Sequence, residues 1–226
     1  NRVVILGGES YHNGIALNSR SNRDVRWEIS KTTNFGIDFS SINNKYTLTA
    51  DYFIRDTEDL LFRLPDSSLA GIGVFPFINT GIVRNKGLEL GLGVNKYEGD
   101  FTYNLSGNMS FIKNELTHLK GGISEVPEGE TQVATHYPLW HAVGEPLYSF
   151  RVIETDGLLR TAAQVTEAQA NGQPNAQLGD IKFVDQNGDK KIDSEDRVYK
   201  GSAFPKTTFG FNGNFTYKNF DLSIFI

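Results

Sequence analysis

The segment that decides the fold is residues 88–111, which read Leu-Glu-Leu-Gly-Leu-Gly-Val-Asn-Lys-Tyr-Glu-Gly-Asp-Phe-Thr-Tyr-Asn-Leu-Ser-Gly-Asn-Met-Ser-Phe. Apolar residues occupy every second position from Leu88 to Val94, and again from Phe101 to Phe111 except at Gly107. Such alternation places successive side chains on opposite faces of a β-strand. Residues 97–100 separate the two runs and contain a glycine suited to a turn. The stretch therefore predicts an antiparallel hairpin with one apolar and one polar face.

Two further segments repeat this pattern on either side. The first has alternating runs over 27–39 and 46–54, with the pair Asn43-Asn44 between them, which is typical of a tight hairpin turn. The second has alternating apolar residues from Phe209 to Tyr217 and again over 222–226. Together the three segments predict six antiparallel strands in three hairpins.

Strand length and connection length both point to a membrane barrel. The expected strands run for about 10 to 14 residues, longer than the usual soluble strand and long enough to cross a bilayer at a steep tilt. The turns at 43–44, 97–100 and 218–220 are short, whereas 56–82 and 120–205 are expected to form long excursions. Because antiparallel strands alternate in direction, all short turns fall at one end, as in outer-membrane barrels. The predicted fold class is all-β, a segment of a transmembrane β-barrel with long extracellular loops.

The two faces of the predicted strands have different roles. The apolar face is expected to contact lipid through Leu90, Leu105, Phe209 and Phe211. The polar face is expected to line the interior through Asn104, Asn108, Asn212 and Asn214. Aromatic residues that flank the short turns predict an interfacial girdle, with the end of a sandwich core as the alternative: Phe39, Tyr46, Tyr97, Phe101, Tyr217 and Phe220.

Composition excludes several classes of function. The chain has 226 residues, with 22 Lys+Arg, 27 Asp+Glu, a net charge of -5 and no cysteine. An acidic balance argues against nucleic-acid binding, and the absence of cysteine excludes disulfides and thiol catalysis. The sequence contains no Gly-x-Ser-x-Gly, no His-Glu-x-x-His and no complete glycine-rich phosphate loop, so we expect no enzyme activity.

Several short motifs carry a family resemblance that covers residues 24–226. They are Trp27-Glu28 and the segments 33–39, 48–53, 56–61, 79–81, 83–90, 107–115, 179–183, 185–196, 201–206 and 220–223. In these motifs the chain resembles the barrel of SusC/RagA-type TonB-dependent transporters. The resemblance implies an outer-membrane barrel of Bacteroidetes type with about 22 strands, which imports oligosaccharides or peptides.

The resemblance also implies partners and a domain organisation. The expected partners are a SusD-like surface lipoprotein, TonB through the missing N-terminal part, membrane lipid and lipopolysaccharide. The chain is expected to be one partial barrel domain: four strands in 24–119, a long extracellular loop in 120–205 and a truncated last hairpin in 206–226. Six strands cannot close a membrane barrel, so two open edges are expected to need partner strands.

An acidic loop at 185–196 predicts a calcium site. Its oxygen donors are Asp185, Asn187, Asp189, Asp193 and Asp196, with the backbone carbonyl of Lys191. Ca²⁺ collects hard oxygen ligands from such short loops, whereas Mg²⁺ keeps more of its waters. Two departures are Lys190 where a glycine is usual, and an aspartate rather than a glutamate at the last position. The bound ion would have a structural role, and a solvated acidic turn is the alternative.

The remaining predictions concern the segment 121–171. Tyr137 and Trp140 are expected to stack on a sugar ring or a peptide side chain, with loop packing as the alternative. His136 and His141 are expected in an exposed loop rather than as a metal pair, and 161–171 is expected to form one short helix. Two other functions remain open: a soluble Ca²⁺-dependent carbohydrate-binding β-sandwich and a β-sandwich glycosidase.

Overall fold

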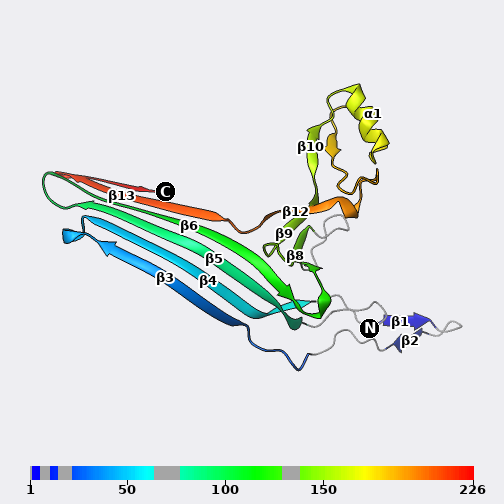
Figure 1. The fold of residues 1–226 in the computed structure, drawn as a ribbon, viewed down its shortest axis with the longest axis horizontal. Coiled ribbons are helices and arrows are strands. Elements are labelled where there is room, and N and C mark those ends of the chain that lie inside the picture. The colour runs from blue at the N-terminus through cyan, green and yellow to red at the C-terminus, as the bar shows by residue number, and fades with distance from the viewer. Residues whose placement is uncertain (1, 6–10, 15–21, 64–76, 129–137) are drawn as a thin grey trace. The chain divides into compact units, whose positions relative to one another are not determined.

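The computed structural model describes residues 2–5, 11–14, 22–63, 77–128 and 138–226. The chain divides into two compact units (Figure 1). The first consists of residues 1–126 and 205–226, and the second of residues 127–204.

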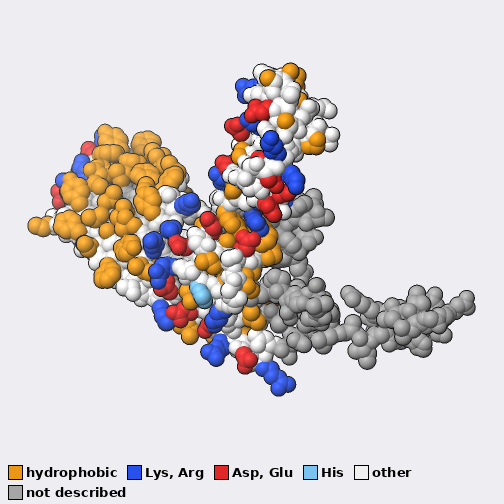
Figure 2. Space-filling view, turned by 45° about the vertical axis from the view of Figure 1, so that its right-hand side comes forward, with side chains coloured by type: hydrophobic (Ala, Val, Ile, Leu, Met, Phe, Trp, Pro, Cys, Tyr) orange, Lys and Arg blue, Asp and Glu red, His pale blue; other side chains and the backbone are white. Residues whose placement is uncertain are grey.

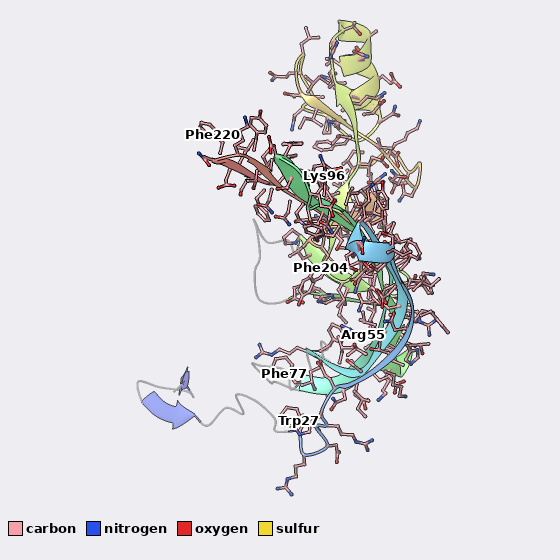
Figure 3. All side chains as sticks on the ribbon, turned by 90° about the vertical axis from the view of Figure 1, so that its left-hand side faces the viewer. Trp27, Arg55, Phe77, Lys96, Phe204 and Phe220 are labelled. Atoms are coloured by element: carbon pink, nitrogen blue, oxygen red, sulfur yellow. The ribbon has the colours of Figure 1, made fainter. Side chains whose placement is uncertain are left out.

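The first unit is built on a six-stranded antiparallel sheet with the order β14-β13-β6-β5-β4-β3. Its strands are β3 (Ile29–Ser40), β4 (Tyr46–Arg63), β5 (Phe77–Lys96), β6 (Phe101–Leu119), β13 (Thr207–Tyr217) and β14 (Phe220–Phe225). A separate two-stranded sheet pairs β1 (Arg2–Ile5) with β2 (Tyr11–Gly14). The prediction of six strands in three hairpins is confirmed. Figure 3, viewed along the strands, shows that the six-stranded sheet is curved and carries side chains on both faces.

The short turns have the backbone that their residues favour. Asn43 and Asn44 lie in the short helical turn η1 (Ile42–Asn44) and adopt φ of 66° and 53°. Asparagine tolerates this left-handed region better than most residues, which explains the Asn-Asn pair between β3 and β4. Lys218 has the same conformation, with φ of 54°, between β13 and β14.

The central strands are longer than the sequence predicts. β4, β5 and β6 contain 18, 20 and 19 residues. The expected excursion over 56–82 is therefore wrong in part, because β4 continues to Arg63 and β5 starts at Phe77. Register shifts between Thr57 and Leu61, with Asp59 at φ of 60°, mark β-bulges. A bulge interrupts the alternation in the sequence while strand pairing continues, so the period-two pattern ends early.

Gly87 in β5 is a position where the sheet needs glycine. It lies opposite Phe53, and an added Cβ would lie 2.6 Å from the carbonyl oxygen of Phe111 and 2.9 Å from the Phe53 ring. We expect Gly87→Ala to lower the free energy of unfolding of the full barrel by about 1–3 kcal/mol, because a backbone oxygen cannot rotate away. Urea unfolding in lipid vesicles measures this loss. Gly107→Ala is the matched control, since its Cβ would meet only the Gly210 oxygen, at 3.8 Å; equal stability of the two variants would contradict the prediction.

The second unit shows that 120–205 is not one irregular loop. A four-stranded sheet has the order β12-β9-β8-β7, and a smaller sheet pairs β10 with β11. The strands are β8 (Leu139–Ala142), β9 (Ser149–Ile153), β10 (Thr155–Leu158), β11 (Ile181–Phe183), β12 (Arg197–Ser202) and β7 (Glu125–Pro127), of which only Pro127 belongs to the second unit. Short helical turns are η3 (Lys120–Gly122), in the first unit, and η4 (Ser194–Asp196). The excursion thus contains a folded unit of its own.

The expected short helix is confirmed as α1 (Ala162–Ala170). Thr161 caps its start by accepting a hydrogen bond from the Gln164 backbone at 3.2 Å, and the Gln164 side chain accepts one from the Thr161 backbone at 3.1 Å. This reciprocal capping box satisfies two amide groups that a helix start leaves free. Leu159, Ala168 and Ala176 form a small buried core beside the helix.

Candidate functional site

The strand register shows that the six-stranded sheet has one continuous apolar face. Directly opposite residues share a face in an antiparallel sheet. The rows of this face are Phe35, Tyr52, Leu88 and Phe111; Ile37, Ala50, Leu90, Met109 and Phe209; Phe39, Leu48, Leu92 and Phe211; and Tyr46, Val94, Leu105 and Ile224. The prediction that Leu90, Leu105, Phe209 and Phe211 share one face is therefore confirmed.

This apolar face is not covered by a second sheet in the part of the chain that the structure describes. Phe35 and Phe209 each keep 69% of their surface exposed, and Leu92 keeps 61%. Figure 2 shows a continuous hydrophobic patch over the six-stranded sheet. A sandwich would bury one face of its strands against another sheet. The arrangement is that of a barrel wall whose outer face meets lipid.

The opposite face carries small polar residues that bond to one another. Asn95, Asn104, Asn214 and Ser223 lie in one row across four strands. The Asn104 side chain donates to Asn95, the Asn95 amide donates to the Asn44 carbonyl at 2.8 Å, and Ser223 donates to Asn214 at 2.8 Å. Asn108 and Asn212 share this face with them. A surface of amides and hydroxyls suits a hydrated interior.

Aromatic side chains surround the short turns as predicted. Tyr97 and Phe220 are 64% and 78% exposed, and the Phe101 ring stacks on Phe215 with ring centroids 6.4 Å apart. Aromatic residues concentrate where a membrane surface meets water. Among the described residues, none of the helices is both long and apolar enough to span a bilayer.

The acidic loop 185–196 is folded by its own side chains. The Asp185 carboxylate accepts hydrogen bonds from the backbones of Gly188 and Lys190, each at 2.7 Å. Asn187 and Asp189 each accept one from the residue two positions later, at 3.0 and 2.9 Å. Lys190 has a φ of 65°, so a lysine makes the sharp turn for which a glycine was expected. The first departure from a calcium loop is thus accommodated by the backbone.

Asp196 closes this loop from its last position. It is fully buried and accepts from the backbones of Asp193 and Gln186, both at 2.8 Å. The bond from the Asp193 backbone is the main cause that lowers the pKa of Asp196, although burial opposes it. In the described ranges, no three acidic or histidine side chains are placed to hold a metal ion. The loop therefore has oxygen donors on one turn, while calcium binding stays a prediction.

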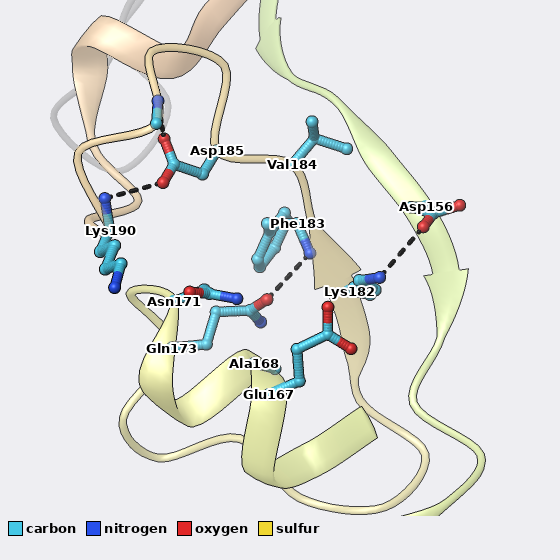
Figure 4. A pocket seen from close by; sticks show the side chains of 11 residues that line it. Asp156, Glu167, Ala168, Asn171, Gln173, Lys182, Phe183, Val184, Asp185 and Lys190 are labelled. Carbon is cyan, nitrogen blue, oxygen red and sulfur yellow. Dashed lines mark hydrogen bonds and ion pairs between the residues drawn. The ribbon is translucent and has the colours of Figure 1, made fainter. Parts of the chain in front are cut away.

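A pocket of about 370 Å³ lies beside the loop within the second unit (Figure 4). Its wall includes Asp156 and Lys182, which form an ion pair at 3.2 Å, and Gln173, whose side chain accepts from the Phe183 backbone at 3.0 Å. Asp185 of the acidic loop also lines it. The sequence did not indicate this pocket, because its walls come from β10, α1 and β11 and meet only in the folded unit.

The aromatic and histidine predictions have different outcomes. Trp140 is half-buried, and the Arg151 guanidinium lies 4.6 Å from its ring centroid, so one face of the indole is already in contact. Tyr137 and His136 lie outside the described residues. The expectation that His141 lies in an exposed loop is wrong: it is 2% exposed, bonds to Glu128 through Nε2 and accepts from the Tyr148 backbone at 3.3 Å. Only the fold brings these partners to His141.

Comparison with known proteins identifies the barrel. The family described as TonB dependent receptor-like, beta-barrel, matches residues 5–220. TonB-dependent receptor P3 of Formosa agariphila is 31% identical over 99% of this chain and 22% of its own length. TonB-dependent receptor SusC of Bacteroides thetaiotaomicron is 31% identical over 89% of this chain and 19% of its own length. These relatives are named receptors, not enzymes.

A solved structure of the RagAB peptide transporter shares the fold. It superposes with a TM-score of 0.70 at 22% identity, over 99% of this chain and 23% of the RagAB chain. The chain thus spans about a fifth of the length of the curated relatives it matches. The family match, together with the long antiparallel strands and their separate apolar and polar faces, shows that the chain belongs to the TonB-dependent receptor β-barrel family of the outer membrane, in which it is similar to SusC.

Proposed function

We propose that this chain forms part of the wall of an importer that takes up oligosaccharides or peptides across the outer membrane. The observation that carries the proposal is the single-layer sheet with an exposed apolar face and a hydrogen-bonded polar face, in a chain of this family. A SusD-like lipoprotein would deliver the substrate, and TonB would supply energy through other parts of the full protein. The chain contributes the wall and its extracellular unit, not chemistry.

The RagAB neighbour is a peptide transporter, which supports peptides as the substrate class. Oligosaccharides are the second proposed class, which the resemblance to SusC/RagA-type transporters implies. Trp140, which lies in the second unit, and Tyr137 would contact the substrate with their aromatic rings. Flat aromatic faces match both sugar rings and apolar peptide side chains.

Uptake by whole cells tests this function. Cells that lack the full-length protein should lose uptake of either fluorescent oligosaccharides or fluorescent peptides, and the intact gene should restore it. Removal of the lipoprotein or of TonB should abolish the restored uptake. If cells with and without the protein take up both substrate pools equally, the importer proposal is wrong.

We also propose that the acidic loop binds Ca²⁺ as a structural ion. Asp185, Asn187, Asp189, Asp193 and Asp196 would supply side-chain oxygens and Lys191 its carbonyl, the hard donors that calcium requires. The two positive charges of the ion would offset half of the negative charge on Asp185, Asp189, Asp193 and Asp196, and so would hold the loop against the rest of its unit.

Chelation should loosen this loop in the full-length protein. Removing calcium should increase protease cleavage between Gly179 and Gly201, because the unneutralised carboxylates repel one another. Asp193→Asn should be cleaved as fast with calcium as the wild type is without it. Glu195→Gln is the matched control, since Glu195 is not one of the six proposed donors; it should keep calcium protection. Equal cleavage of the wild type with and without calcium would contradict the site.

A further inference from the structure

Two lysines lie directly opposite each other on adjacent strands, on the apolar face of the sheet. The register of β5 and β6 pairs Lys86 directly with Lys113, and both are exposed. Like charges in directly opposite positions repel and destabilise a sheet. Lys113 bonds to Glu115 at 2.6 Å, whereas no carboxylate among the described residues forms an ion pair with Lys86. Glu115 also interacts electrostatically with Lys86, so the two lysines share one carboxylate and keep one uncompensated positive charge.

Strand alternation places this pair on the lipid side and not on the interior side. Lys86 precedes Leu88 by two residues, and Lys113 follows Phe111 by two, so all four side chains share the apolar face. The neighbouring row contains Phe35 and Tyr52. Figure 2 shows basic side chains at the edge of the hydrophobic patch. Because bare charge is tolerated on this face only near a membrane surface, the lysines mark a boundary of the apolar band.

The distance of the lysine pair from the short turns places it at the outer boundary of the membrane. Lys96 lies beside the short turn of β5, and Lys86 is ten residues away on the same strand and face. Ten residues extend about 33 Å along a strand, which at a tilt of about 40° spans about 25 Å across the membrane. That height matches the apolar band of an outer-membrane barrel. Since short turns face the periplasm, the lysine pair lies at the outer leaflet.

The next row outward is already neutralised. Arg84 holds Asp56 with two bonds, at 2.7 and 2.8 Å, and Lys31 bonds to Glu58 at 2.6 Å. Glu115, opposite Arg84, is the one further carboxylate of this row, and Lys113 already holds it, so Lys86 shares it without an ion pair of its own. An external anion is the remaining source of compensating charge.

We propose that Lys86 and Lys113 together bind a phosphate group of an outer-leaflet lipid, a phosphorylated glycolipid of the lipopolysaccharide type. Two ammonium groups on adjacent strands suit a doubly charged phosphate between them. The apolar row with Leu88 and Phe111 lies immediately below and offers a surface for the acyl chains of the same molecule. A free phosphate would compensate the charge of the lysines but would leave this apolar surface uncovered. We therefore assign the site to a lipid. The inference depends on the membrane position of the barrel and not on which substrate is imported.

The test uses full-length protein purified in detergent and measures bound lipopolysaccharide by native mass spectrometry. The double variant Lys86→Gln with Lys113→Gln should retain about tenfold less of the phosphorylated lipid, because both charge-assisted contacts are lost. Lys86→Arg with Lys113→Arg should retain the wild-type amount. Lys96→Gln is the matched control, since it removes a lysine from the same strand and face at the other boundary.

Two further arms identify the ligand. Dephosphorylated lipopolysaccharide should bind wild type and double variant equally weakly, and inorganic phosphate should not displace the intact lipid. Equal retention by the wild type and the glutamine variant, both migrating as folded barrels, would overturn the proposal. Displacement of the lipid by inorganic phosphate alone would overturn it as well, since the acyl surface would then contribute nothing.

Discussion

Leu90→Arg in the full-length protein should destabilise the barrel by about 2–4 kcal/mol, because it places a charge on the lipid face near the middle of the membrane. Leu90 lies in the row of Ile37, Ala50, Met109 and Phe209, roughly midway between the short turns and the lysine pair. At that depth an arginine cannot easily reach either membrane surface. Urea unfolding of the protein in lipid vesicles measures the loss.

Asn108→Arg is the matched control for this prediction. Asn108 lies opposite Gly91, so it occupies the row next to Leu90 at nearly the same depth but on the polar face. The same arginine should there meet water and cost little. If Asn108→Arg were the more damaging of the two variants, the assignment of faces would be reversed.

The sequence predicted those features of the fold that depend on residues close together along the chain. Alternation around Leu90 and Phe209 predicted six strands and both faces, because side-chain direction along a strand has a local period of two. The short helix predicted over 161–171 is likewise local, since the capping box that starts α1 joins Thr161 and Gln164, which are three residues apart.

The features that sequence reasoning missed depend on pairing across the fold. The continuation of β4 past Asp59 follows a bulge that breaks the alternation. In the second unit, β12 pairs with β9 across more than forty residues of sequence, and both strands are too short for a clear pattern. Lys86 and Lys113 do interrupt the apolar alternation of their strands, which is a visible signal, but only the register shows that they meet.

Residues 1–226 expressed alone in buffer without detergent should form large aggregates. The six-stranded sheet ends in β3 and β14, and the smallest membrane barrels need about eight strands to close. Each open edge therefore presents unpaired N–H and C=O groups that can pair with another molecule. The exposed apolar face, with Phe35, Leu92 and Phe209, would add hydrophobic association over a large area.

Light scattering measures this outcome, and the same chain in detergent is the control. Detergent should reduce the aggregate size because it covers the apolar face, although the two edges remain open. A monodisperse monomer without detergent that melts cooperatively would contradict the wall arrangement. Such a monomer would need to bury Leu92 and Phe209 against other residues of its own chain, which is the packing of a soluble sandwich and not of a membrane wall.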